Sequence, residues 1–136
     1  MRRLAIVIAA VTATACTTAP PPSPEQVART QARLQELTAG KVAQAPISCL
    51  QHYNANDMVV IDENTVAFKN GRTVYIAHMN GPCSNLGGAS YALLTKDSGS
   101  MGLCRGDIAR VIDTSLHMTV GSCTFGDIIP YVSSAG

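Results

Sequence analysis

The sequence predicts a mainly β protein, a small antiparallel barrel or curled sheet, preceded by one N-terminal helix. From Pro46 onward, apolar residues recur at nearly every second position, which is the spacing of half-buried strands. Turn-forming Gly, Asn and Asp residues separate these segments at intervals of about 8–12 residues. Residues 25–45 instead carry apolar side chains at helical spacing. We therefore expect a helical segment at 25–45 and a β domain at 46–136.

Residues 1–15 have the pattern of a signal peptide. Met1, Arg2 and Arg3 form a short positive region, and an uninterrupted apolar stretch follows at residues 4–11. The apolar segment is shorter than the ~20 residues that a membrane-spanning helix needs. Ala13 and Ala15 have the small side chains that signal peptidase requires. We therefore expect an exported protein.

Cys16 follows Ala15 directly, and this junction resembles the lipobox of bacterial lipoproteins. That resemblance implies lipidation of Cys16, and Thr17 after it implies the periplasmic face of the outer membrane. The alternative is cleavage to a soluble periplasmic protein. Residues 16–24, rich in proline, would form an extended tether between membrane and domain.

The helix is expected to begin near Ser23. Ser23 is a suitable N-cap, Pro24 suits the first turn, and Gln26 completes a capping box. Gly40 is a plausible stop. The apolar stripe is thin, with Val27, Leu34 and Leu37 as its large members, so we expect the helix to lie on the domain edge rather than to bind a partner.

Nine strands are expected in the β domain, at 47–52, 57–61, 65–69, 73–78, 90–95, 101–104, 108–112, 116–122 and 128–132. Asn70-Gly71 predicts a hairpin turn in which both residues have positive φ. Residues 80–89 are expected to form a loop. The similar segments 104–108 and 123–128 are interpreted as two similar turns.

The chain has five cysteines, and setting Cys16 aside leaves an even set of four. Two disulfides are the expectation for an exported chain, with three possible pairings. We favour Cys49–Cys123, joining the two ends of the domain, and Cys83–Cys104, closing a Gly-rich loop. The alternative is a zinc site that also uses His52, His78 and His117. No two cysteines have the C-x₂₋₄-C spacing, however, so we expect no metal.

Charge and motifs exclude several function classes. The chain has 10 basic and 9 acidic residues, and without Arg2 and Arg3 the acidic residues prevail. No basic stripe remains for a nucleic acid. Asp97-Ser98-Gly99 partly matches a protease nucleophile turn, but Lys96 stands where that turn needs glycine. Catalytic and cofactor motifs are otherwise missing, so we expect neither an enzyme nor a cofactor.

The histidines and aspartates have ordinary structural explanations. All three histidines lie in expected strands, where a half-buried hydrogen-bonding role is more common than general-base catalysis. Four aspartates flank expected turns, where carboxylates accept backbone N–H bonds: Asp62, Asp107, Asp113 and Asp127.

Several segments resemble a family of small exported four-cysteine proteins of unknown function from Gram-negative, sphingomonad-like bacteria. They are Cys49, Asn80-Gly81-Pro82-Cys83 with Leu86-Gly87, Leu103-Cys104-x-Gly106-Asp107-Ile108, and Gly121-Ser122-Cys123-x-Phe125-Gly126 with Pro130. The resemblance implies an exported, disulfide-bonded β domain and no assigned activity.

Gly88-x-x-Tyr91 resembles part of the inhibitory loop of periplasmic lysozyme inhibitors, with Gly87 in place of that loop's serine. This resemblance implies a partner contact through Tyr91, Gly88 and the loop at 84–90. The first expectation for function is an envelope domain with a binding or structural role. The alternatives are an inhibitor of a cell-wall hydrolase and a small hydrolase that uses strand histidines.

Overall fold

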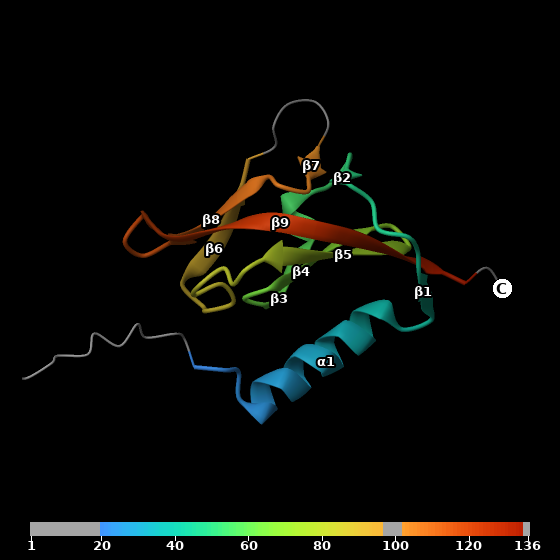
Figure 1. The fold of residues 1–136 in the computed structure, drawn as a ribbon, viewed down its shortest axis with the longest axis horizontal. Coiled ribbons are helices and arrows are strands. Elements are labelled where there is room, and N and C mark those ends of the chain that lie inside the picture. Colours follow the sequence, from blue (N-terminus) through green and yellow to red (C-terminus); the bar gives the residue numbers. More distant parts are fainter. Residues whose placement is uncertain (1–19, 97–101, 135–136) are drawn as a thin grey trace, which may run out of the picture.

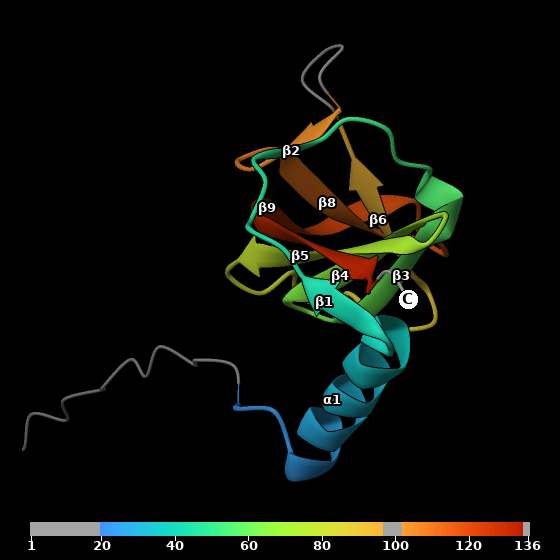
Figure 2. The same ribbon diagram turned by 90° about the vertical axis from the view of Figure 1, so that its right-hand side faces the viewer.

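The body of the protein is a single antiparallel sheet of seven strands that curls into a half-barrel (Figures 1 and 2). The computed structural model describes residues 20–96 and 102–134. Residues 1–19, with Cys16, and residues 97–101 lie outside that range. The described elements, in chain order, are α1 (Pro24–Thr38), β1 (Lys41–Ala43), β2 (Cys49–Leu50), the 3-10 turn η1 (Ala55–Asp57), β3 (Met58–Asp62), β4 (Thr65–Asn70), β5 (Thr73–Asn80), β6 (Tyr91–Thr95), β7 (Leu103–Cys104), β8 (Ile108–Asp113) and β9 (Met118–Ser133).

The strand order in the sheet is β3-β4-β5-β9-β8-β6, and β1 pairs with the far end of β9. A second, two-stranded sheet joins β2 to β7 above the curl. The predicted fold class is therefore confirmed: a mainly β protein with a curled sheet and one preceding helix. No helix within residues 20–96 and 102–134 is both long enough and apolar enough to cross a membrane.

The β4–β5 hairpin is where the Asn-Gly signal predicted it, shifted by one residue. Asn70 pairs with Thr73, so the two loop residues are Gly71 and Arg72. Only Gly71 has positive φ, +59°, and the expectation of positive φ at Asn70 is wrong. A two-residue loop that needs positive φ only at its first position satisfies the hairpin. Asn70 stays in the strand, and its side-chain amide donates to the carbonyl of His52 at 3.2 Å.

β9 is one strand of 16 residues, although two strands with a turn at 123–128 were expected. β8 pairs with residues 118–124 of it and β5 with residues 124–131, so partners along both halves keep the backbone extended. Gly126 sits where the β5 register shifts, and a Cβ there would lie 2.9 Å from the carbonyl oxygen of His78. The glycine thus permits a close backbone approach at a bulge rather than a turn.

Three other expected boundaries differ. The expected strand 47–52 is reduced to the two residues of β2 and a single bridge between Ile47 and Ile128. The expected strand 116–122 begins at Met118, because residues 114–117 form the β8–β9 turn, with His117 at φ +54°. The helical segment expected at 25–45 ends at Thr38 and is followed by β1.

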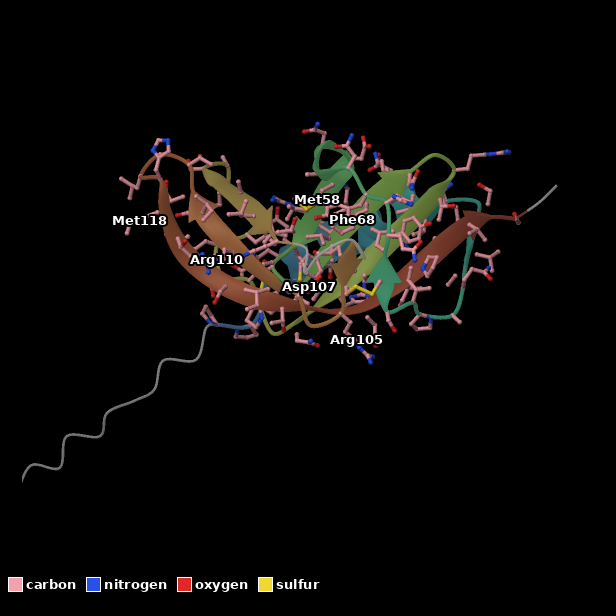
Figure 3. All side chains as sticks on the ribbon, turned by 90° about the horizontal axis from the view of Figure 1, so that it is seen from above. Met58, Phe68, Arg105, Asp107, Arg110 and Met118 are labelled. Carbon is pink, nitrogen blue, oxygen red and sulfur yellow. A yellow bond between two sulfur atoms is a disulfide. The ribbon has the colours of Figure 1, made fainter. Side chains whose placement is uncertain are left out.

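Apolar side chains form two layers, one on each face of the sheet. The larger lies inside the curl and includes Phe68 (Figure 3), whose ring centroid is 6.4 Å from that of the buried Phe125. The smaller lies between α1 and the outer face and consists of Leu37, Ala67, Val74 and Ile76. β4 is therefore buried on both faces, which explains its uninterrupted run of apolar residues at 66–68.

The helix lies on the domain edge, as the thin apolar stripe predicted. Its capping box is present: the Ser23 hydroxyl accepts from the backbone N–H of Gln26 at 3.2 Å, and the Gln26 side chain accepts from the N–H of Ser23 at 2.7 Å. Leu34 and Leu37 pack against the outer face of the sheet. Val27 remains 40% exposed on the N-terminal half, which extends beyond the sheet (Figures 1 and 2).

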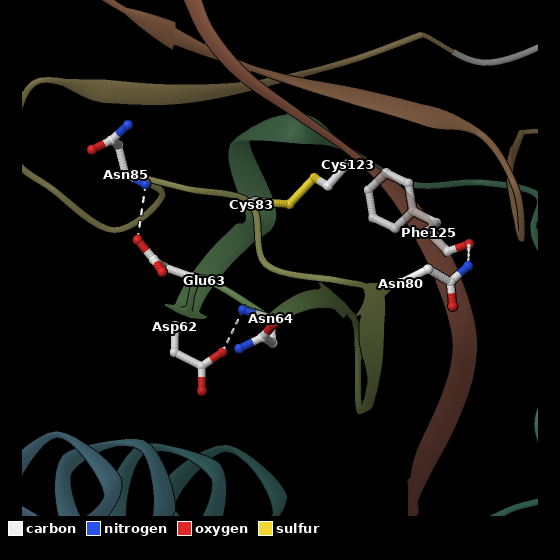
Figure 4. Close-up of a disulfide and its surroundings, with 8 residues drawn as sticks. All are labelled: Asp62, Glu63, Asn64, Asn80, Cys83, Asn85, Cys123 and Phe125. Atoms are coloured by element: carbon white, nitrogen blue, oxygen red, sulfur yellow. Dashed lines mark hydrogen bonds between the residues drawn. A yellow bond between two sulfur atoms is a disulfide. The ribbon is translucent and has the colours of Figure 1, made fainter. Parts of the chain in front are cut away.

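All four cysteines of the β domain are in disulfides, but the favoured pairing was wrong. Cys49 is bonded to Cys104, and Cys83 to Cys123. Cys49 and Cys104 face each other in the β2–β7 pair, with Cα atoms 3.9 Å apart. Cys123 does not mark the end of the domain, because β9 carries it through the middle of the sheet, opposite Ala109. There it meets the loop that begins at Cys83 (Figure 4).

Candidate functional site

The loop at 84–90, where a partner contact was expected, is held firmly at its start. Cys83 is bonded to Cys123, and the N–H of Cys83 donates to the carbonyl of Glu63 at 2.7 Å. The carboxylate of Glu63 accepts from the N–H of Asn85 at 2.8 Å (Figure 4). The loop is thereby tied both to β9 and to the β3–β4 turn.

Gly88 and Tyr91 have different exposures within this region. Gly88 is exposed, whereas Tyr91 is half-buried and packs against the core inside the curl. The N–H of Tyr91 donates to the carbonyl of Gly88 at 3.1 Å, and the ring lies across that glycine. The exposed surface of the loop thus comes from small and polar residues, chiefly Ser84, Asn85 and residues 87–90.

The three histidines occupy different parts of the structure. His78 lies on β5, as expected, whereas His52 follows β2 and His117 lies in the β8–β9 turn. The expectation that all three lie in strands is therefore wrong for His52 and His117. All three are exposed, so the expected half-buried role is wrong. Across residues 20–96 and 102–134, no group of three or more His, Cys, Asp or Glu side chains could hold a metal ion.

Three of the four aspartates accept backbone N–H bonds at turns, as expected. Asp62 accepts from Asn64 at 2.8 Å, Asp113 from Ser115 at 2.8 Å, and the buried Asp107 from Cys104 at 2.7 Å. Asp127 differs because it lies within β9, where it forms an exposed ion pair with Arg105 at 3.0 Å.

A shallow cleft of about 290 Å³ lies between the segment around β2 and the β4–β5 hairpin and was not foreseen from the sequence. Its lining comes from the segment around β2 and from the β4–β5 hairpin, and consists of Ile47, Cys49, Leu50, Gln51, His52, Asn70 and Tyr75. Leu50 and Tyr75 also belong to the core inside the curl, so the cleft lies directly above that core. We refer to it below as the mouth cleft.

The β2 side of the mouth cleft is fixed although it has little strand structure. The N–H of Ile47 donates to the carbonyl of Ile128 at 2.8 Å, and the carbonyl of Ser48 accepts from Arg105 at 2.7 Å. The Cys49–Cys104 disulfide follows, and the Asn70 amide holds the carbonyl of His52. This segment is therefore anchored at both ends.

Gly102 adds a further restraint on the same segment. A Cβ at Gly102 would lie 2.7 Å from Cα of Gln51 and would also collide with the carbonyl oxygen of Leu50. Only a glycine allows β7 to approach β2 this closely, and φ at Gly102 is +79°. This close approach lets β2 pair directly with β7, the strand that carries Cys104.

The chemistry of the mouth cleft is polar but almost uncharged. Gln51, His52 and Asn70 are exposed, and Tyr75 is half-buried. Of the described residues that line it, none is Asp, Glu, Lys or Arg. Within the described chain, the side chains of Gln51, His52 and Tyr75 have no protein hydrogen-bond partner, so their polar groups are available to a ligand.

Sequence reasoning missed this site because its two halves are 18 or more residues apart in the chain, as the His52–Asn70 hydrogen bond shows. The local signal at Asn70-Gly71 predicted a hairpin, not a neighbour for that hairpin. Comparison of the chain with protein-family models, with curated proteins and with solved structures finds no match.

Proposed function

We propose that this protein is an exported component of the cell envelope, anchored by a lipid on Cys16, whose β domain has a binding or structural role rather than a catalytic one. The observation that carries the proposal is the pair of disulfides, which join β2 to β7 and the Cys83 loop to β9. Disulfides of this kind form and persist in oxidising compartments such as the periplasm.

The arrangement of the N-terminal segment supports an anchored protein. The helix α1 begins at Pro24, immediately after the proline-rich stretch, and its first half reaches away from the sheet. A Pro-rich chain favours extended conformations and acts as a semi-rigid spacer. Such a spacer, followed by the helix, would hold the domain away from a bilayer surface.

Cell fractionation and intact-mass measurement test this proposal together. We expect the native protein in the outer-membrane fraction, beginning at Cys16 and carrying acyl chains. Reductant should add two hydrogens for each of the two disulfides. The Cys16→Ser variant is the matched control, because it should be released from the membrane while keeping both disulfides. Recovery from the cytosol with Met1 present and every thiol reduced would contradict the proposal.

A second candidate, inhibition of a cell-wall hydrolase, is favoured by the 84–90 loop. Apart from the buried Leu86, the loop is exposed, and none of its side chains is charged. The Cys83–Cys123 disulfide and the Glu63–Asn85 bond hold it in place. A preorganised loop loses little conformational entropy on binding, as tight inhibitors require. The expected partner surface is then the loop itself rather than the half-buried ring of Tyr91.

An activity assay with a lysozyme as target tests this second candidate. Ala89→Arg places a large charged side chain on the exposed loop, and Ala39→Arg does the same at an exposed position after α1. Inhibition should be lost in the first variant and retained in the second. Equal inhibition by both variants, or none by the unmodified protein, would exclude the loop as an inhibitory surface.

A further inference from the structure

We propose that the mouth cleft binds an uncharged, hydroxyl-rich ligand, a sugar unit of a neutral glycan. This inference rests on the binding role in the proposed function and specifies its site and ligand class. The cleft lies next to the core inside the curl, because Leu50 and Tyr75 line it and also belong to that core.

The charge of the lining favours a neutral ligand. Apart from the imidazole of His52, the described lining side chains are apolar or carry amide and phenol groups. A carboxylate or phosphate would meet no lysine or arginine in this lining, and an ammonium would meet no carboxylate. An ionic ligand therefore gains no ion pair with Lys, Arg, Asp or Glu here, which favours a neutral ligand.

The polar groups suit hydroxyls in particular. The Gln51 amide both donates and accepts, as do a neutral imidazole and a phenol, and a sugar hydroxyl does the same. Gln51 and His52 approach from the β2 side, while Asn70 and Tyr75 approach from the β4–β5 hairpin. One amide N–H of Asn70 is used to hold the carbonyl of His52, which leaves its other N–H and its oxygen for a ligand.

The apolar part of the lining matches the C–H faces of a sugar ring. Leu50 is buried beneath the cleft, Ile47 is half-buried beside it, and the half-buried ring of Tyr75 belongs to the opposite side. Its volume of about 290 Å³ is at the lower limit for small-molecule sites, which run to about 300–1,000 Å³. The site therefore fits one or two sugar rings rather than a larger molecule.

Rigidity makes a site of this size effective. The Cys49–Cys104 disulfide and the bonds of Ile47, Ser48 and Asn70 fix the backbone that carries Gln51 and His52. Little backbone ordering then opposes binding, so a few hydrogen bonds suffice for measurable affinity.

The test is an NMR titration of the full mature chain, with both disulfides oxidised, against N-acetylglucosamine trimer and maltotriose. These two neutral glycans represent a wall-type and a storage- or capsule-type source. We expect saturable shifts centred on residues 47–52 and 70–75 with at least one of them, and the stronger binder identifies the source. A charged sugar acid is the third probe, and it should bind more weakly than either.

Variants tie the binding to the named side chains. Gln51→Ala and His52→Ala each remove one exposed hydrogen-bonding group and should weaken binding roughly three- to tenfold. His78→Ala is the matched control, because it removes an exposed histidine outside the cleft and should leave affinity unchanged. Tyr75→Phe keeps the ring and tests the phenol alone.

Three results would overturn the inference: no saturable shifts with either neutral glycan, shifts centred away from the cleft, or tighter binding of the sugar acid. Unchanged affinity in the Gln51→Ala/His52→Ala double variant would do the same. These results are independent of fractionation, so the envelope location could hold while the glycan site fails.

Discussion

The ring of Tyr91 lies across Gly88, so closely that a Cβ atom at position 88 would stand 2.6 Å from Cδ2 of the ring. The same tyrosine packs against the core inside the curl. The relationship couples the exposed loop to the interior, because any side chain at position 88 must displace a ring that the core holds in place.

Gly88→Ala should destabilise the protein by about 1–3 kcal/mol, the usual cost of forcing an extra methyl group into a packed site. Since the chain has no tryptophan, far-UV circular dichroism in a urea titration is the suitable measurement.

The double variant Gly88→Ala/Tyr91→Ala controls for other effects of the alanine. If the contact with the ring is the cause, the cost of Gly88→Ala should nearly vanish when Tyr91 is already alanine. An additive pair of effects would show that the ring and the glycine are independent.

The two disulfides should differ in their susceptibility to reduction under native conditions. Cys83 is 0% exposed and Cys123 8% exposed, whereas Cys49 and Cys104 are half-buried. Thiol exchange requires access to a sulfur, so dithiothreitol should open Cys49–Cys104 first. Alkylation followed by mass spectrometry measures this order, and equal rates in the folded protein would contradict the burial argument.

Tryptic mapping without reductant checks the connectivity directly. Cleavage after lysine and arginine places the cysteines in four separate peptides, 42–69, 73–96, 97–105 and 111–136. We expect the linked pairs 42–69 with 97–105 and 73–96 with 111–136. Any other pair of linked peptides would show a different disulfide framework.

Gly102→Ala should be clearly more destabilising than Gly106→Ala. Both glycines have positive φ, +79° and +92°, so backbone strain should lower the free energy of unfolding of either alanine variant by about 1–2 kcal/mol. A Cβ at Gly106 meets nothing within 4 Å, whereas one at Gly102 strikes the backbone of Leu50 and Gln51. The difference in unfolding free energy therefore reports the close approach of β2 and β7, and equal losses would argue against it.

Leu37→Ala should lower the free energy of unfolding by about 2–3 kcal/mol, because the leucine side chain is 8% exposed and packs between α1 and the sheet. Val27→Ala, at a 40% exposed position of the same helix, should change stability by less than about 0.5 kcal/mol. Urea denaturation of both variants tests whether only the C-terminal half of α1 packs on the domain. A similar loss in both would indicate that the N-terminal half also packs.

Much of the candidate site was beyond prediction from local patterns. Local patterns place Gln51 and His52 in a strand and Asn70 in a turn, because such patterns depend only on neighbours in the chain. The mouth cleft forms because the β4–β5 hairpin lies beside the segment around β2. The hydrogen bond from the Asn70 amide to the carbonyl of His52 joins the two. Contacts between distant segments leave no periodic signal in the sequence, so only the tertiary structure shows which segments meet.

What the sequence by itself determined was the class of fold and most of its parts: the capped helix, the alternating strands, the hairpin at Asn70-Gly71 and an even set of paired cysteines. These follow from interactions over a few residues, namely capping, side-chain alternation and the φ values that glycine allows. Only the tertiary structure decided that β9 runs unbroken through residues 123–127 and which cysteines meet. The physical reason lies in the pairing of β9. β8 pairs with its first half, residues 118–124, which places Cys123 in the sheet near Cys83, and β5 pairs with residues 124–131, which overrides the local turn signal at Gly126.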